Sequence, residues 1–310
     1  MTLKKFVDIE RLGHENNKDI LFFGDDMIDI EEKVDGGCGA MWREDDGYHV
    51  GSRNRDLSFE GGKKTFAKQR IWLTNHLTEI GKNGITLNPE FIYYFEWMQL
   101  HTIRYTCAPD VIGFDIRLKH SMGDENECGL FLDRKAKEKE FLRIGIECVP
   151  LVWEGKANEL KKLNIIDMIP KSKYYDGLCE GAVIKNYGRK NPSHNYQLFA
   201  KVVRDEFKEA NKAVFGNVKN KESDTQKIIE QYCTEARIRK AVLKYVNEDG
   251  LKLELALMKY VPTYVIKDIL KEEFKEIYEQ YSFIDFKEMK KIVPKLCIKV
   301  ISQMMVEQVI

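Results

Sequence analysis

The pattern of apolar and polar positions divides the chain into two parts. Up to about residue 204, short apolar or alternating runs are separated by clusters of Gly, Asn and Asp, which is typical of strands and turns. Helices are predicted at 63–80 and within 158–168. We therefore expect an α+β domain with antiparallel sheets and flanking helices. The predicted strands are 27–35, 40–43, 48–52, 91–97, 111–118, 129–132, 181–186 and 197–203.

Beyond that point the apolar positions recur at helical spacing. Ser223 and Asp224 form a good helix N-cap, and apolar residues follow at near-helical intervals. Pro262 interrupts the pattern before a second stretch with one apolar face. Residues 284–306 are predicted to be helical, with Pro294 kinking or splitting the helix. This part of the chain is predicted to be all-α.

Length and composition fit a globular protein of two domains. The chain has 310 residues, of which 43% are apolar and 32% charged, and this length is typical of about two domains. We place the domains at residues 1–204 and 205–310. The formal net charge is zero, with 50 basic and 50 acidic side chains. A nucleic-acid interface would therefore have to come from the spatial arrangement of charges.

Cysteine usage and hydropathy bear on the compartment. The seven cysteines include no C-x-x-C pair, so neither a zinc site nor a disulfide framework is expected. No apolar run approaches the ~18 residues needed to span a bilayer, and no signal peptide opens the chain. We expect a soluble protein of the cytoplasm or another reduced intracellular compartment, without a membrane partner, and favour a monomer.

One lysine stands at the end of an apolar strand, directly before a glycine-rich turn. A lysine becomes a nucleophile when burial or neighbouring positive charge destabilises its ammonium. A glycine-rich turn lets a phosphate approach the backbone closely. For this motif alone, the alternative is a surface lysine on a hairpin. The segment is Glu31-Glu32-Lys33-Val34-Asp35-Gly36-Gly37-Cys38-Gly39.

A second segment of the form E-G-x-V-x-K follows far downstream. Alternation along a strand places Glu180 and Ala182 on one face, and Lys185 on the other. The carboxylate near the turn is then available as a hard oxygen ligand for Mg²⁺. For this motif alone, the alternative is an exposed Glu and Lys on an edge strand. The segment is Glu180-Gly181-Ala182-Val183-Ile184-Lys185.

Taken in order, with further matches between and after them, the two segments resemble the covalent nucleotidyltransferase superfamily of ATP-dependent ligases and mRNA capping enzymes. Within it, the chain looks like the nick-sealing RNA ligases of phage and RNA-editing type. The resemblance covers roughly residues 30–204, whereas residues 205–310 match only in being helical. It implies a nucleotidyltransferase (ATP-grasp-like ligase) domain of antiparallel sheets, followed by an all-α domain.

The resemblance also implies roles for the lysine motif. Lys33 resembles the adenylated lysine, and Asp35 and Gly36 complete its motif. Glu32 is expected to flank the adenine pocket. RNA ligases of this branch usually have Asn where this chain has Cys38, and a thiol cannot supply the same hydrogen bonds.

Further matches concern the nucleotide. Arg53 resembles the arginine that contacts the nucleotide and the end being joined, with Arg55 as the second choice. Glu96, in Phe95-Glu96-Trp97, looks like the glutamate that binds the ribose. Phe114, in Gly113-Phe114-Asp115-Ile116, looks like the aromatic residue that stacks on adenine.

The last matches concern metal and phosphate. Glu180 resembles the metal-binding glutamate and Lys185 a phosphate contact. Lys201, in Leu198-Phe199-Ala200-Lys201-Val202-Val203, resembles the lysine that holds the α-phosphate. The family commonly has two lysines in K-x-K form there, so Arg204 is a candidate for the missing contact.

These matches imply an ATP-dependent RNA ligase that uses ATP and Mg²⁺ (or Mn²⁺) and acts in RNA repair. It would join 3′-OH and 5′-phosphate RNA ends, with a nicked duplex as the expected substrate, through ligase-(lysyl-N)-AMP and 5′-adenylylated RNA. A DNA ligase and a GTP-dependent RNA capping guanylyltransferase are alternatives, but these usually carry a small β-barrel where this chain is helical. A non-catalytic nucleic-acid-binding protein is a further alternative.

Overall fold

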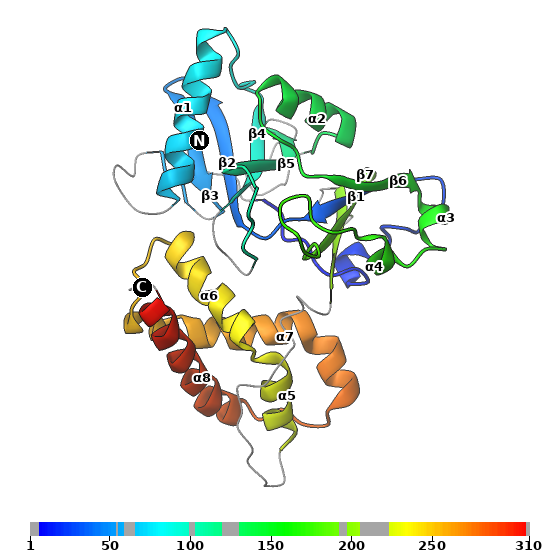
Figure 1. Ribbon diagram of the computed structural model, residues 1–310. Helices are drawn as coiled ribbons and strands as arrows, with labels where there is room; N and C mark the ends of the chain where they lie inside the picture. The colour runs from blue at the N-terminus through cyan, green and yellow to red at the C-terminus, as the bar shows by residue number, and fades with distance from the viewer. Residues whose placement is uncertain are drawn as a thin grey trace. The chain divides into compact units, whose positions relative to one another are not determined.

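The computed structural model describes residues 6–53, 55–58, 66–98, 103–119, 130–191, 197–204 and 223–307. The chain divides into two compact units, Met1–Arg204 and Asp205–Ile310. Figure 1 draws the first in blue to green and the second in yellow to red. Each unit has its own apolar core.

Two four-stranded antiparallel sheets form the framework of the first unit. The first sheet has the strand order β6-β1-β7-β8 and the second the order β3-β2-β4-β5. The predicted α+β fold with antiparallel sheets is confirmed. The strands are β1 (Met27–Lys33), β2 (Gly37–Glu44), β3 (Gly47–Ser52), β4 (Phe91–Trp97), β5 (Val111–Leu118), β6 (Leu151–Lys156), β7 (Gly181–Lys190) and β8 (Gln197–Val203).

The helices of this unit depart more from the prediction. The stretch expected to be one helix forms two short ones, because Asn164 caps the second through its side chain. One helix was not predicted, since its sequence RKAKEKEFLR is almost entirely charged. In the predicted strand 129–132, Phe131 forms only an isolated bridge to Arg117, and Gly129 lies outside the described residues. The helices are η1 (Glu15–Asn17), α1 (Ala67–Lys82), α2 (Arg134–Arg143), α3 (Ala157–Leu160) and α4 (Ile165–Met168).

The two faces of the first sheet differ in chemistry. Side chains alternate along a strand, so residues paired across strands share a face. Ile30 and Ile184 pair on the face that packs into an apolar core with Leu160. The opposite face, called here the lysine face, carries Lys33 beside Gly181, Glu31 beside Val183 and Lys201, and Asp29 beside Lys185.

The second sheet packs one face on α1 and α2 through a core that includes Met41, Tyr93 and Trp97. Its other face carries Ala40, Cys38, Tyr94 and Glu96, which are paired in register. Phe199 of the lysine face joins one apolar cluster with Ala40 and Tyr94. The lysine face of the first sheet and the Glu96 face of the second sheet therefore meet.

The second unit is helical in all its described elements, as predicted. Ser223 caps α5 by accepting a hydrogen bond from Gln226 N. Thr234 caps α6, so the predicted continuous run is two helices. Pro262 lies in the first turn of α7, where its missing N–H costs no helical hydrogen bond. Helix α8 continues through Pro294. The elements are α5 (Asp224–Tyr232), α6 (Glu235–Asn247), η2 (Leu255–Lys259), α7 (Val261–Gln280) and α8 (Phe286–Glu307). None of these described helices, or those of the first unit, has the length and apolar content needed to cross a bilayer.

Candidate active site

Lys33 and Glu180 form an ion pair at the edge where β1 ends and β7 begins. Lys33 is the last residue of β1 and pairs with Gly181, the first residue of β7. The Lys33 Nζ lies 2.5 Å from the Glu180 Oε2, and the side chains are 22% and 6% exposed. A Cβ on Gly181 would meet the Val202 carbonyl oxygen at 2.0 Å, so only glycine fits beside the lysine. The two motifs, 147 residues apart in sequence, thus form one site.

Asp35 anchors the turn that follows Lys33. It is 2% exposed, and its Oδ2 accepts a hydrogen bond of 2.8 Å from the Ile103 backbone N–H. Its own backbone N–H donates to the Tyr105 hydroxyl at 2.8 Å. The side chain is therefore engaged in holding the turn against residues 103–105, which is a positioning role.

Gly36, Cys38 and Glu96 lie together between β2 and β4. Cys38 pairs with Glu96 across the strands, so their side chains share a face of the second sheet. A Cβ on Gly36 would lie 2.8 Å from the Trp97 carbonyl oxygen and 3.2 Å from Glu96 Oε2. The close approach of the Trp97 carbonyl oxygen therefore favours glycine at position 36, with the Glu96 carboxylate beside it.

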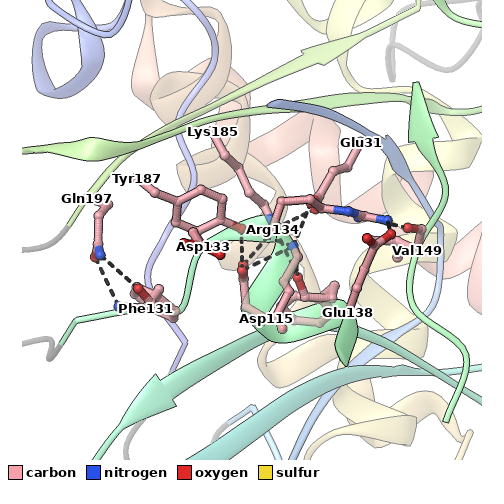
Figure 2. Close-up of polar contacts among 12 residues, drawn as sticks. Glu31, Asp115, Phe131, Asp133, Arg134, Glu138, Val149, Lys185, Tyr187 and Gln197 are labelled. Atoms are coloured by element: carbon pink, nitrogen blue, oxygen red, sulfur yellow. Dashed lines mark hydrogen bonds and ion pairs between the residues drawn. The ribbon is translucent and has the colours of Figure 1, made fainter. Parts of the chain in front are cut away.

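Lys185 belongs to a buried charge network on the lysine face, which Figure 2 shows. Its Nζ lies 2.6 Å from Glu31 Oε2, 2.8 Å from Asp115 Oδ2 and 3.0 Å from the Phe114 carbonyl oxygen. These three oxygens match the three donors of an ammonium. The side chain is only 2% exposed. Lys185 is therefore tied to oxygens of β1 and β5 within the protein.

Helix α2 supplies two further cations to the network. The fully buried Lys137 Nζ lies 2.6 Å from Glu31 Oε1 and 2.6 Å from the Phe114 carbonyl oxygen. Arg134 donates to Glu31 Oε1 at 2.9 Å and to the Val149 carbonyl oxygen at 3.0 Å. Glu31 lies on β1, Asp115 on β5 and Lys185 on β7, so the network ties α2 to all three strands.

Proton affinities in the network follow from its charge balance. Burial acts to raise the pKa of Glu31, but Lys137, Lys185 and Arg134 outweigh it and lower the pKa to about 2. For Lys185, burial is outweighed by Asp115 and Glu31, which raise its pKa. Burial dominates for Lys137 and lowers its pKa. Lys137 is therefore the cation of the network that loses its proton most readily.

Phe114 occupies a bulge of β5, where the pairing register with β4 shifts. Its ring packs edge-on against Phe6, with centroids 4.8 Å apart, and lies nearly parallel to the Tyr94 ring at 6.4 Å. Its carbonyl oxygen accepts from both Lys137 and Lys185. The buried network therefore fixes the backbone that carries this ring.

Lys201 and Arg53 come from strands at the outer edges of the two sheets. Lys201 is half-buried on the lysine face, opposite Val183. Its backbone is held by hydrogen bonds with Glu10 and Leu12. Arg53 follows β3 and forms an ion pair with Asp8.

Arg55 and Glu32 have different local settings. The Arg55 backbone N–H donates to Ser52 Oγ at 3.2 Å. Glu32 lies on the face of β1 opposite to Lys33, and its Oε1 accepts from Ser172 Oγ at 2.6 Å. Burial raises the pKa of Glu32. The structure therefore does not bring the Glu32 carboxylate to the lysine face.

Sequence reasoning missed the residues that hold Lys185. Asp115 directly follows Phe114 and Glu31 lies two positions before Lys33, so alternation alone puts Glu31 on the face of Lys33. Arg134 and Lys137 carry no comparable signal, because a charged helix is normally a solvated one.

Among the described residues, no group of three or more His, Cys, Asp or Glu side chains is arranged to hold a metal ion. A divalent ion at Glu180 would therefore take most of its ligands from outside the protein. Mg²⁺ is often bound in this way, through one or two carboxylates with substrate phosphates and water. The single carboxylate beside Lys33 fits that pattern.

Residues 27–203 match the model of the RNA ligase family. The match covers more than half of the 310 residues, and the chain belongs to this family. The resemblance that the motifs predicted is thereby confirmed. None of the curated proteins compared with the chain matches it.

Similar solved structures include Naegleria gruberi RNA ligase in several states. A variant with ATP and Mn is 16% identical, with 65% of this chain and 56% of that chain covered and a TM-score of 0.44. The ligase with PPi is 15% identical, with 67% and 57% covered and a TM-score of 0.44. A variant with AMP and Mn is 16% identical, with 66% and 57% covered and a TM-score of 0.43. The chain thus spans less than two thirds of the length of these structures.

Proposed function

We propose that the protein is an ATP-dependent RNA ligase that joins a 3′-OH to a 5′-phosphate RNA end. The observation that carries the proposal is the ion pair of Lys33 and Glu180 at the meeting point of two strands. Membership of the RNA ligase family supports it. The Naegleria gruberi structures with ATP and Mn, with AMP and Mn, and with PPi agree with a nucleotide and a divalent metal.

The first step forms a covalent intermediate on Lys33. The neutral amine attacks the α-phosphorus of ATP, the bond to the bridging oxygen breaks, and pyrophosphate leaves. Glu180 Oε2, 2.5 Å from Nζ, is within reach of the proton that the ammonium must lose. The product is AMP bonded to Nζ through a phosphoramidate.

Two further transfers complete the reaction. The first returns Lys33 to its free form, and the second seals the strand. An oxygen of the RNA 5′-phosphate attacks the AMP phosphorus, and the N–P bond breaks. The 3′-OH then attacks the activated 5′-phosphate, loses its proton and releases AMP. Negative charge builds up on phosphate oxygens in each step, so positioning and electrostatic stabilisation dominate catalysis.

Lys201, Arg53 and Glu180 would bind the charged parts of the substrates. Lys201 shares the lysine face with Lys33 and is assigned to the α-phosphate, and Arg53 to the nucleotide and the RNA end. Glu180 would hold Mg²⁺ or Mn²⁺, which supplies positive charge to the phosphates when bound.

Glu96, Phe114 and Lys185 would position the nucleotide. Glu96 is assigned to the ribose hydroxyls and Phe114 to the adenine ring. Lys185, with its three oxygen partners, is assigned to holding Phe114 rather than to a phosphate. Asp35 and Gly36 shape the turn after Lys33.

RNA is the proposed substrate because the described residues after Arg204 form helices. A helical module suits recognition of duplex shape and 2′-hydroxyls, and a nicked duplex is the proposed form. A reducing compartment is proposed because the seven cysteines include no C-x-x-C pair.

The test is transfer of label from ATP labelled at the α-phosphate, with Mg²⁺ present. Wild type and Lys171→Ala should become labelled, whereas Lys33→Ala should not. Lys171 is a suitable control because it is a surface lysine that also pairs with one carboxylate, Asp176. Label on the Lys33→Ala protein, or an unlabelled wild type, would overturn the proposal.

The same reactions separate the related activities. Labelling by GTP in place of ATP would indicate a capping guanylyltransferase. Matched RNA and DNA duplexes, each with one 3′-OH/5′-phosphate nick, distinguish an RNA from a DNA ligase by the product sealed. An RNA ligase should seal the RNA nick faster.

A further inference from the structure

Helix α8 carries a row of lysines on its exposed face. Lys287, Lys291, Lys295 and Lys299 follow one another at intervals of four residues, and all four are exposed. Residues at this interval are neighbours on a helix surface. The opposite side of α8, with Met289, Val293 and Val300 among others, is buried in the core of the helical unit. We call these four residues the α8 lysine row.

Lysines outnumber carboxylates on helix α8. The helix contains five lysines and only two glutamates. Glu288 accepts a hydrogen bond from Ser223 Oγ at 2.7 Å, and Glu307 pairs with Arg239 at 2.7 Å. Within the part of the chain that the structure describes, no carboxylate forms an ion pair with a lysine of the row. Like charges at this spacing destabilise a helix, so the row works against the stability of α8.

Helix α7 of the same unit shows the ordinary arrangement. Its lysines at positions 267, 271 and 275 also follow a four-residue interval, but the helix has five acidic residues among them. Such mixing of signs is typical of a solvated face. The exposed face of α8 therefore differs in charge from that of α7.

We propose that the α8 lysine row binds the phosphate backbone of duplex RNA. A step of four residues advances about 6 Å along a helix, so the row extends over about 18 Å. That step is close to the separation of successive phosphates along one strand of an A-form duplex. Lysine acts as a point charge toward phosphate without reading sequence. The inference rests on the proposed function, since it assigns part of the substrate contact to the helical unit.

The test is binding of a fluorescein-labelled RNA duplex, with one central 3′-OH/5′-phosphate nick, to the full chain without ATP. Fluorescence anisotropy is measured between 50 and 250 mM NaCl, roughly the range over which such contacts weaken strongly. The variant is Lys291→Gln with Lys295→Gln. The control is Lys267→Gln with Lys275→Gln on α7, which removes the same charge from a mixed face.

For the α8 variant, the slope of log K against log [salt] should become shallower by about 1.8, because each lost phosphate contact contributes about 0.9. At 0.1 M salt this corresponds to binding about tenfold to sixtyfold weaker. The α7 control should bind as wild type does. Equal losses in both variants, or no loss on α8, would overturn the proposal; the latter result would leave an acidic protein as the partner of this face.

Self-adenylation separates this inference from the proposed function. Both variants should take label from ATP as wild type does, because only residues of α7 and α8 change. A wild type that binds RNA through α8 but takes no label would overturn the ligase activity alone. If wild type takes label and the α8 variant binds RNA as tightly as wild type does, the α8 inference alone is overturned.

Discussion

Lys33 and Lys185 share one face of the first sheet but differ in their surroundings. Lys33 ends β1, is partly exposed and pairs with the single carboxylate of Glu180. Lys185 lies within β7, is buried and has three oxygen partners. A lysine with one partner at a strand end can exchange that partner for a reacting group. A lysine with every donor engaged holds the structure around it.

The energetic consequences should differ in the same way. Removing one member of a buried ion pair leaves a charge without compensation, which typically costs about 3–5 kcal/mol. Loss of Lys33 leaves only the single carboxylate of Glu180 without its cation, beside a partly exposed position, which should cost less, about 1–3 kcal/mol. Substitution of Lys185 is therefore expected to destabilise the protein, and substitution of Lys33 to abolish its activity.

The largest expected effect is that of Lys33→Met on activity. Loss of the nucleophile should reduce nick sealing by roughly 10⁴-fold or more, while the free energy of unfolding falls by about 1–3 kcal/mol because Glu180 loses its cation. Sealing of a nicked RNA duplex and urea denaturation measure the two quantities. Substantial sealing by this variant would show that Lys33 is not the nucleophile.

Lys185→Met should instead lower the free energy of unfolding by about 3–5 kcal/mol. Both Glu31 and Asp115 would lose a cation in the buried interior. A double-mutant cycle with Asp115→Asn should give a coupling energy of about 1–3 kcal/mol in urea denaturation. Near-normal stability of the single variant, with lost adenylation, would favour a direct phosphate contact for Lys185.

A carboxylate at the edge of the same network should respond to pH. Burial, followed by the nearby carboxylates Glu31 and Glu154, raises the pKa of Asp29 to about 6. The folded protein therefore binds this proton more tightly than the unfolded chain does. The resulting stability is fully present below the ordinary pKa of about 4 and is lost as the pH rises through 6.

Asp29→Asn imitates the protonated side chain. It is expected to raise the free energy of unfolding by about 1–2 kcal/mol at pH 7.5 and to have a much smaller effect at pH 4.5. Urea denaturation at the two pH values measures the difference, with the surface variant Asp25→Asn as control. A gain of the same size at both pH values would contradict the raised pKa.

The smallest expected effect concerns lysines that have no acidic partner among the described residues, those of the α8 lysine row. Lys291→Glu replaces two repulsions, with Lys287 and Lys295, by attractions along the helix. The free energy of unfolding should rise by about 0.5–1 kcal/mol at low salt, and the gain should shrink as salt is added. A lower stability would contradict the expected repulsion along the row.

Local sequence features predicted much of the fold. The bounds of β4, β5 and β8 agree with the strands predicted from apolar runs, and Ser223 caps α5 as its side chain indicated. Alternation and pairing are short-range, so a run of residues suffices to predict them. Helix α2 escaped prediction because its interior-facing residues include Arg134 and Lys137, which are charged.

In the candidate site, too, local motifs identified some residues, whereas their contacts come from the structure. The glycine-rich turn and the strand before it identified Lys33, and the second motif identified Glu180; family resemblance joined them, and the structure has them 2.5 Å apart. Alternation turns the Glu32 carboxylate to the other face of β1, where it accepts a hydrogen bond from Ser172, and its place beside the adenine stays a prediction. The roles of the site residues remain predictions that the labelling experiment tests.

The sequence by itself determined the position of most strands, the change from β-rich to helical structure, and the lysine that ends β1. Only the tertiary structure decided what each lysine touches. Arg134 reaches Glu31 across 103 positions of the chain, and Lys185 reaches Asp115 across 70. Periodicity acts over a few neighbouring residues, whereas the partners of a buried charge depend on which strands and helices the fold brings together.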